Sequence, residues 1–162
     1  MRIPRHEHGF TIAELLLALA ITGVLLAAVA VAFNASITNY RQNEHIFKTI
    51  NSARQTLSRI TSQLRDANSV NPDSPINECA LETSDGNFET YRYNNSDNKL
   101  YLDANSNSYV LCDNVTSMTF KKNAVTEGGQ RKVKSVQISM TVASGNVRRT
   151  LPAAAVVRRN LK

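Results

Sequence analysis

The stretch Gly9-Phe10-Thr11-Ile12-Ala13-Glu14-Leu15 opens an apolar run that continues to Phe33 and decides how the rest of the chain is built. Between Phe10 and Phe33 the chain contains no proline and a single charged residue, Glu14. A helix of this composition can cross a hydrocarbon core of about 30 Å, which needs roughly 20 residues. A carboxylate inside such a span is costly, so we expect Glu14 to have a partner and a function.

The nine residues before the run form a short leader in which Arg2 and Arg5 outnumber Glu7. A secretory signal peptide places its small-residue cleavage site after the apolar region and loses that region. Here the small residue, Gly9, stands before the apolar region, although residues 27–30 are a weak candidate for signal cleavage. Signal cleavage and a generic single-pass anchor with an accidental Glu therefore stay as alternatives.

A basic leader, a Gly, an aromatic residue and a Glu at a fixed offset together resemble the cleavage and methylation motif of type IV prepilins and type II secretion pseudopilins. The resemblance implies that a membrane-embedded peptidase cuts after Gly9 and N-methylates Phe10, the new first residue. It also implies that Glu14 accepts the Phe10 amine of another subunit and sets the register between helices. Within its own helix we expect no donor for Glu14, because Arg5 leaves with the leader.

Helical spacing of apolar residues continues beyond Phe33, with basic and polar residues between them. We expect one helix from the membrane to about residue 70, ending before Pro72. The apolar stripe of its outer half consists of Ile37, Tyr40, Phe47, Ile50, Leu57, Ile60, Leu64 and Ala67.

The remainder of the chain, residues 71–162, has the pattern of short strands separated by turn clusters. After a loop over residues 72–87, strands are expected at 88–93, 99–102, 109–112, 117–121, 133–142 and 147–151. Hairpins in sequence predict a mainly antiparallel sheet, one face of which covers the helix stripe. The expected fold class is α+β and matches the pilin-like fold: leader 1–9, membrane helix 10–33, amphipathic helix 34–70 and sheet domain 71–162.

Two cysteines, Cys79 and Cys112, lie in the part that the basic leader would leave outside the cytoplasm, where disulfides persist. A bridge closing a loop of about 34 residues would stabilise the fold by roughly 3–4 kcal/mol. We expect this bridge, with two free thiols as the alternative. A redox or metal role is disfavoured because the chain has no Cys-x-x-Cys and no His near either cysteine.

Other candidate sites are weaker. Residues 103–107 have the oxygen spacing of a calcium loop but lack its Gly and its terminal Glu, so a turn is the better interpretation. Basic residues of the C-terminal hairpins would offer contacts to DNA phosphates if they converged near one hairpin, but no aromatic platform accompanies them, and a solvated surface that keeps the domain soluble is the better interpretation. These basic residues are Arg131, Lys132, Lys134, Arg148 and Arg149. The histidines, His6, His8 and His45, form no catalytic set, and we expect no enzyme activity, cofactor or metal.

The function that the resemblance implies is that of a minor prepilin subunit in a helical filament anchored in the bacterial inner membrane, with its sheet domain periplasmic or extracellular. Residues 136–142 and 156–160 resemble the end of J-type minor pseudopilins, which favours a type II secretion pseudopilus. Implied partners are other pilins and pseudopilins, the prepilin peptidase, an assembly ATPase and an inner-membrane platform. A type IV pilus minor pilin and a filament-tip receptor for DNA or surfaces are the alternatives, although nucleic acid is not the expected partner.

Overall fold

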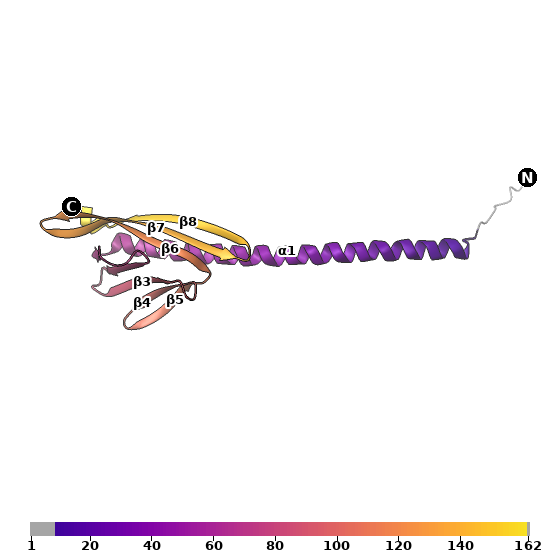
Figure 1. Cartoon of the computed structure of the whole chain (residues 1–162), viewed down its shortest axis with the longest axis horizontal. Helices are drawn as coiled ribbons and strands as arrows, with labels where there is room; N and C mark the ends of the chain where they lie inside the picture. Colours follow the sequence, from indigo (N-terminus) through magenta and orange to yellow (C-terminus); the bar gives the residue numbers. More distant parts are fainter. Residues whose placement is uncertain (1–8, 162) are drawn as a thin grey trace, which may run out of the picture. The chain divides into compact units, whose positions relative to one another are not determined.

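One long helix precedes all the strands in the computed structural model of the chain, which describes residues 9–161 (Figure 1). Helix α1 spans Ile12–Asp66 and is followed by eight strands and a short 3-10 helix, η1, at Arg158–Leu161. The strands are β1 (Ser69–Val70), β2 (Glu78–Glu82), β3 (Phe88–Asn94), β4 (Lys99–Ala104), β5 (Asn107–Cys112), β6 (Val115–Glu127), β7 (Gln130–Ser144) and β8 (Val147–Val156). The α+β, pilin-like fold class is therefore confirmed.

The chain divides into two compact units, Met1–Arg41 and Gln42–Lys162. The first contains the apolar part of α1, and the second contains the outer part of α1 with all the strands. The boundary falls inside the helix, eight residues beyond the end of the apolar run at Phe33. Most of the predicted leader, residues 1–8, lies outside the described residues.

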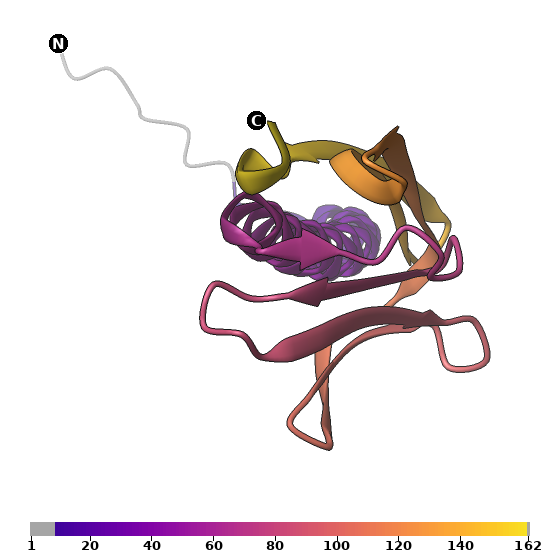
Figure 2. The ribbon, with the colours of Figure 1, turned by 90° about the vertical axis from the view of Figure 1, so that its left-hand side faces the viewer.

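The strands form two antiparallel sheets where the sequence predicted one. Strands β1 to β5 pair in chain order, and β6 to β8 form a separate three-stranded sheet in chain order. The chain passes between them at residues 113–114, where Asn114 has a positive φ of 59°. Gly128 and Gly129, both with positive φ, make the tight turn that lets β6 and β7 continue as one long hairpin. Seen along α1, β2 and β3 lie on one side of the helix and β8 with η1 on the other (Figure 2).

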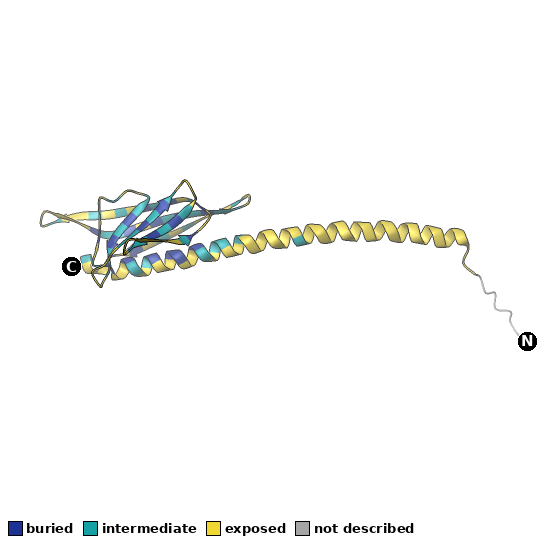
Figure 3. Ribbon diagram, turned by 90° about the horizontal axis from the view of Figure 1, so that it is seen from below, coloured by how far each residue is buried: buried dark blue, intermediate teal, exposed yellow. Residues whose placement is uncertain are grey.

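The core of the second unit lies between the outer part of α1 and the inner faces of both sheets. Ala53, Thr56, Leu57, Ile60 and Leu64 are buried and recur at the helical interval of three or four residues (Figure 3). The Thr56 hydroxyl donates to the carbonyl oxygen of Leu111 at 3.1 Å and ties the helix to β5.

The predicted helix stripe is confirmed only over its last part. Leu57, Ile60, Leu64 and Ala67 are buried and Ile50 packs against the core. By contrast, Tyr40 and Phe47 keep 72% and 68% of their surface exposed. Helical periodicity identifies a face, but it does not say how far along that face the sheets extend.

Several element boundaries differ from the sequence prediction, and β6, β7 and β8 are all longer than expected. Helix α1 ends at Asp66, and Ser69–Val70 pairs as β1 with the end of β2. Strand β2 occupies part of the predicted loop, with Cys79 and Leu81 buried and their neighbours half-buried. The sequence did not predict this strand, because its short alternation of buried and half-buried residues is flanked by Asn, Ser, Asp and Pro, which are typical of loops.

Candidate processing and assembly site

The predicted cleavage point lies outside the helix. Gly9, Phe10 and Thr11 precede the first helical residue, Ile12, and all three are exposed. Phe10 keeps 88% of its surface exposed, and a Cβ added at Gly9 would meet no atom within 4 Å. The peptide bond between Gly9 and Phe10 is therefore free of helical hydrogen bonds and sterically open, as a bond must be for a peptidase to reach it.

Glu14 closes the first turn of α1 in a reciprocal capping arrangement with Thr11. Its Oε2 accepts from the Thr11 backbone N–H at 2.9 Å and from the Thr11 hydroxyl at 3.0 Å. In return, the Glu14 N–H donates to the Thr11 Oγ1 at 3.3 Å. This is a capping box, with Thr as the N-cap and Glu three residues later.

The capping box corrects one sequence prediction. We expected no donor for Glu14 within its own helix, and that prediction is wrong, because Thr11 supplies two. The signal was present in the order Thr11-Ile12-Ala13-Glu14, which has the spacing of a capping box. Two neutral donors reduce the cost of placing a carboxylate in the apolar run, but they leave its charge uncompensated.

The helix that follows Glu14 presents apolar side chains on which no other residue of the described range, 9–161, is packed. It is long and apolar enough to cross a membrane, with a mean hydropathy of 2.8 in its most apolar stretch and none of that stretch buried. The large exposed side chains include Leu15, Leu16, Leu17, Leu19, Ile21, Val24, Leu25, Leu26, Val29, Val31 and Phe33. Such a surface requires lipid or other apolar helices around it.

The two cysteines do not form the predicted bridge. Cys79 on β2 and Cys112 at the end of β5 are both buried free thiols. Strands β3 and β4 lie between β2 and β5, and three strand spacings of about 4.8 Å separate the two residues by roughly 14 Å. A disulfide requires Cα atoms within about 7 Å. Loop length suggested the bridge, but strand order prevents it.

Burial changes the acidity of both thiols. It raises the pKa of Cys79 to about 11, against an ordinary value of 9.0. Burial also raises the pKa of Cys112, whose sulfur lies 3.9 Å from the Ser52 hydroxyl. Both cysteines are thus unreactive core residues rather than a redox pair.

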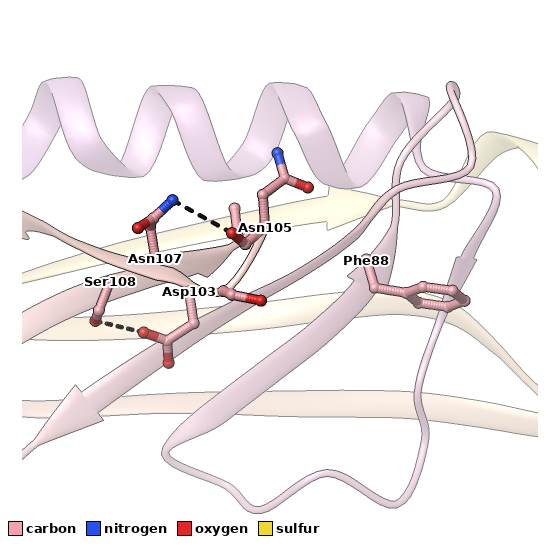
Figure 4. Close-up of a pocket in the computed structure, with 7 residues that line it drawn as sticks. Phe88, Asp103, Asn105, Asn107 and Ser108 are labelled. Carbon is pink, nitrogen blue, oxygen red and sulfur yellow. Dashed lines mark hydrogen bonds between the residues drawn. The ribbon is translucent and has the colours of Figure 1, made fainter.

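The segment with calcium-loop spacing is a hairpin turn between β4 and β5. Asp103 is already engaged. Arg92 Nε donates to one of its oxygens at 2.8 Å. The Ser108 hydroxyl donates to the other oxygen (Figure 4). Arg92 in this way holds the pKa of the Asp103 carboxyl below its usual value, and Ser108 adds to the effect. Asn105 and Ser106 turn with positive φ. The only negative charge of the turn is therefore already paired.

The basic hairpin residues do not converge, so the structure does not support the DNA-contact candidate. Arg131, Lys132 and Lys134 lie at the start of β7, whereas Arg148 and Arg149 follow its end. Arg148 and Arg149 pair with Ala143 and Val142, so the two groups lie roughly 25–40 Å apart along β7 at about 3.3 Å per residue. Lys134 also pairs with Glu127 at 2.8 Å, and Arg131 pairs with Asp73.

Of the histidines, His45 is exposed on α1, while His6 and His8 lie outside the described residues. Within residues 9–161, no group of three or more His, Cys, Asp or Glu side chains is arranged to hold a metal ion.

Comparison with known proteins bears on the N-terminal segment alone. Residues 4–30 match the family model of the prokaryotic N-terminal methylation motif. No curated protein and no solved structure matches the chain significantly. The matched residues include the open peptide bond at Gly9, the capping box and most of the exposed apolar helix.

Proposed function

We propose that this chain, which carries the N-terminal methylation motif that is the hallmark of type IV prepilin-like proteins, is a minor subunit of a helical filament anchored in the bacterial inner membrane. The observation that carries the proposal is the combination of an open Gly9–Phe10 bond, Glu14 at the helix start and an apolar helix whose most apolar stretch is left unburied by the described part of the chain. Its role is structural rather than enzymatic. The sheet domain would lie on the periplasmic or extracellular side.

The first step is processing by a prepilin peptidase. Hydrolysis of the Gly9–Phe10 bond releases the leader and creates a positive amine on Phe10, which then receives the methyl group. Because α1 begins only at Ile12, the scissile bond is presented in non-helical backbone while the apolar helix stays in the membrane. The capping box fixes this helix start, since Thr11 ends the helical hydrogen bonding on the N-terminal side.

The second step is assembly, in which Glu14 meets the amine of another subunit. In the isolated chain, Glu14 accepts two hydrogen bonds from Thr11 but has no cation within its own helix turn. The Phe10 amine of an adjacent processed subunit would supply that charge. In surroundings of low dielectric, such a pair offsets the cost of burying both ions and sets the axial stagger between helices.

A J-type-like position in a type II secretion pseudopilus is the finer part of the proposal. The resemblance of residues 136–142 and 156–160 to J-type minor pseudopilins implies a strand pair followed by a tail, and two observations support this position. Strands β7 and β8 pair along their length, and η1 follows them. The Asn160 side chain donates to the Val133 carbonyl at 3.0 Å, and Val157 is fully buried, so the tail is part of the fold. A type IV pilus minor pilin shares these features, and the genes beside this one would separate the two systems.

The test of the proposal is the variant Glu14→Leu, compared with Glu44→Gln. Glu44 is an exposed acidic residue on the same helix, beyond the apolar run, and serves as the matched control. Glu14→Leu should insert into the membrane and be cleaved like the parent, because the segment becomes more apolar. It should nonetheless be missing from sheared or purified filaments, whereas Glu44→Gln should be present. Normal incorporation of Glu14→Leu would show that Glu14 does not set the register.

A further inference from the structure

An open hollow lies at the turn between β4 and β5, and neither processing nor assembly makes use of it. Its volume is about 340 Å³, and it is lined by Phe88 and by residues 103–108 (Figure 4). Phe88 begins β3, whereas the other residues end β4, form the turn and begin β5. The Phe88 ring stands apart from the amide and hydroxyl side chains of the turn, so one side of the hollow is aromatic and the other is polar.

Phe88 supplies an apolar ring that the core does not use. Its side chain keeps 77% of its surface exposed, the highest value for a large apolar residue among residues 67–161. A single exposed apolar side chain is ordinary on a protein surface. This one differs because it borders a hollow with polar groups on its other side, and a combination of apolar surface with a few polar groups is typical of sites for small ligands.

The polar side of the hollow has unused hydrogen-bonding groups. Within residues 9–161, the side chains of Asn105 and Ser106 make no hydrogen bond. Asn107 donates one amide N–H to the Asn105 carbonyl oxygen at 3.2 Å and keeps its own side-chain oxygen free. Amides and hydroxyls each offer donors and acceptors, so these three residues can bind a ligand group that also does both.

The turn holds two of these side chains at a conformational cost. Asn105 and Ser106 have φ angles of 51° and 62°, in the left-handed region that favours glycine. Asn tolerates this region better than Ser does, and a two-residue hairpin turn of this kind favours Asn followed by Gly. In the part of the chain that the structure describes, Ser106 is the one residue with positive φ that is neither Gly nor Asn. Its hydroxyl therefore stands where glycine would fit the backbone better.

The lining also narrows the chemistry of the ligand. None of the lining residues is basic, and the one carboxylate, Asp103, is already engaged by Arg92 and Ser108. An anionic ligand would thus find no cation, and a metal ion would find no free carboxylate. A neutral ring that carries hydroxyls at its rim and C–H groups on its face matches both sides of the hollow. Sugar rings have this structure.

We propose that the hollow binds one neutral sugar ring, with the C–H face of the ring on Phe88 and its hydroxyls on the polar side chains of residues 105–107. The volume lies at the lower end of the range for small-molecule sites, roughly 300–1,000 Å³, so a terminal sugar unit fits better than a long chain. All lining residues belong to the unit Gln42–Lys162, and none takes part in cleavage or in the contact of Glu14. The inference therefore goes beyond the proposed function and does not depend on it.

The test is a sugar titration of the full-length chain in dodecylphosphocholine micelles, followed by the backbone amide NMR signals. This detergent has no sugar headgroup to compete for the hollow. The probes, added one at a time, are cellobiose, lactose, maltose and N,N′-diacetylchitobiose, with sorbitol as an open-chain polyol. At least one disaccharide should shift the amide signals of residues 105–108 to saturation, and sorbitol should leave them unchanged.

Three variants remove one contact each: Phe88→Ala, Asn105→Gly and Ser106→Gly. The two glycine substitutions suit the positive φ at their positions, so the turn should keep its conformation. Each variant should weaken binding of the active disaccharide by about tenfold. The matched controls are Asn98→Gly, at an exposed Asn with a φ of 56° in the turn between β3 and β4, and Phe47→Ala, at an exposed ring on α1. Both controls should bind like the parent.

The absence of a saturable shift with all four disaccharides would overturn the inference. Equal shifts with sorbitol would overturn it as well, since the ring face would then be irrelevant. Undiminished binding by all three variants would place the sugar elsewhere on the chain. Shifts of the same signals by calcium chloride, without any shift by sugar, would make the hollow a cation site instead. None of these results bears on the mature N-terminus, whose mass tests the proposed function separately.

Discussion

The thiol of Cys79 should be present as a free but protected group, and its labelling rate follows from the structure. The side chain is fully buried, and burial raises its pKa to about 11 from an ordinary 9.0. At pH 8, an ordinary thiol of pKa 9.0 is about 10% thiolate, whereas one of pKa 11 is about 0.1% thiolate. The reactive form is thus about a hundredfold rarer, before exclusion of the reagent by the core is counted.

The assay is maleimide labelling of the full-length chain at pH 8, without reductant, followed by mass measurement. The folded chain should gain no label at Cys79 or Cys112 within minutes, and the denatured chain should gain two labels. A denatured chain that gains two labels only after reduction contains a Cys79–Cys112 bridge and refutes the strand order described above. Rapid labelling of the folded chain would instead refute the burial of the thiols.

Three further predictions concern the core, the hairpin and the helix start. Ile60→Ala should lower the free energy of unfolding by about 2–5 kcal/mol in chemical denaturation, because Ile60 is fully buried between helix and sheets. The control variant Phe47→Ala, at an exposed site, should lower it far less. Arg92 holds the pKa of Asp103 below its usual value, so Asp103 should stabilise the fold at neutral pH, and this stabilisation should be lost as the pH falls through the folded-state pKa. In thermal unfolding measured at decreasing pH, the unfolding temperature of Asp103→Asn should therefore fall less than that of the parent. Thr11→Ala should remove about 1 kcal/mol from the helix N-terminus and speed amide exchange at Glu14 in detergent micelles, and an unchanged exchange rate would contradict the capping box.

The sequence predicted the helix and its strand partners well where periodicity was sustained. The apolar run after Gly9 and the alternation of Val136, Ile138, Met140 and Val142 both appear as predicted, in α1 and β7. A long, regular pattern of apolar residues is consistent with a helix or with a strand but not with both, because only one of the two repeat lengths keeps the apolar residues on the same face. Even so, β7 extends beyond the predicted strand at both ends, since turn glycines rather than apolar residues limit it.

The errors arose where function depends on which strands are neighbours. The sequence predicts a Cys79–Cys112 bridge, and it offers convergence of the basic residues of two hairpins as a weaker candidate. Both expectations used distance along the chain, whereas β3 and β4 separate the cysteines and the length of β7 separates the hairpin ends. Strand order and the division into two sheets result from tertiary packing, which local pattern does not specify.

The capping box was missed for a different reason. Thr11 and Glu14 have the required spacing, but a carboxylate in an apolar run also predicts a partner on another subunit, and that prediction draws attention away from the local role. The structure shows that the same carboxylate has a local role before any assembly occurs. One residue can therefore define the helix start in the isolated chain and still be available to a neighbouring amine.

The most direct test of the account is the mass of the mature N-terminus in protein taken from the cell envelope. Cleavage between Gly9 and Phe10, with one methyl group on the Phe10 amine, is the predicted result, and Gly9→Leu should leave the precursor uncut in the membrane. An N-terminus beyond Phe33 would mean that the apolar run had been removed as a signal peptide. That result would contradict the proposal that the chain is a prepilin-type subunit.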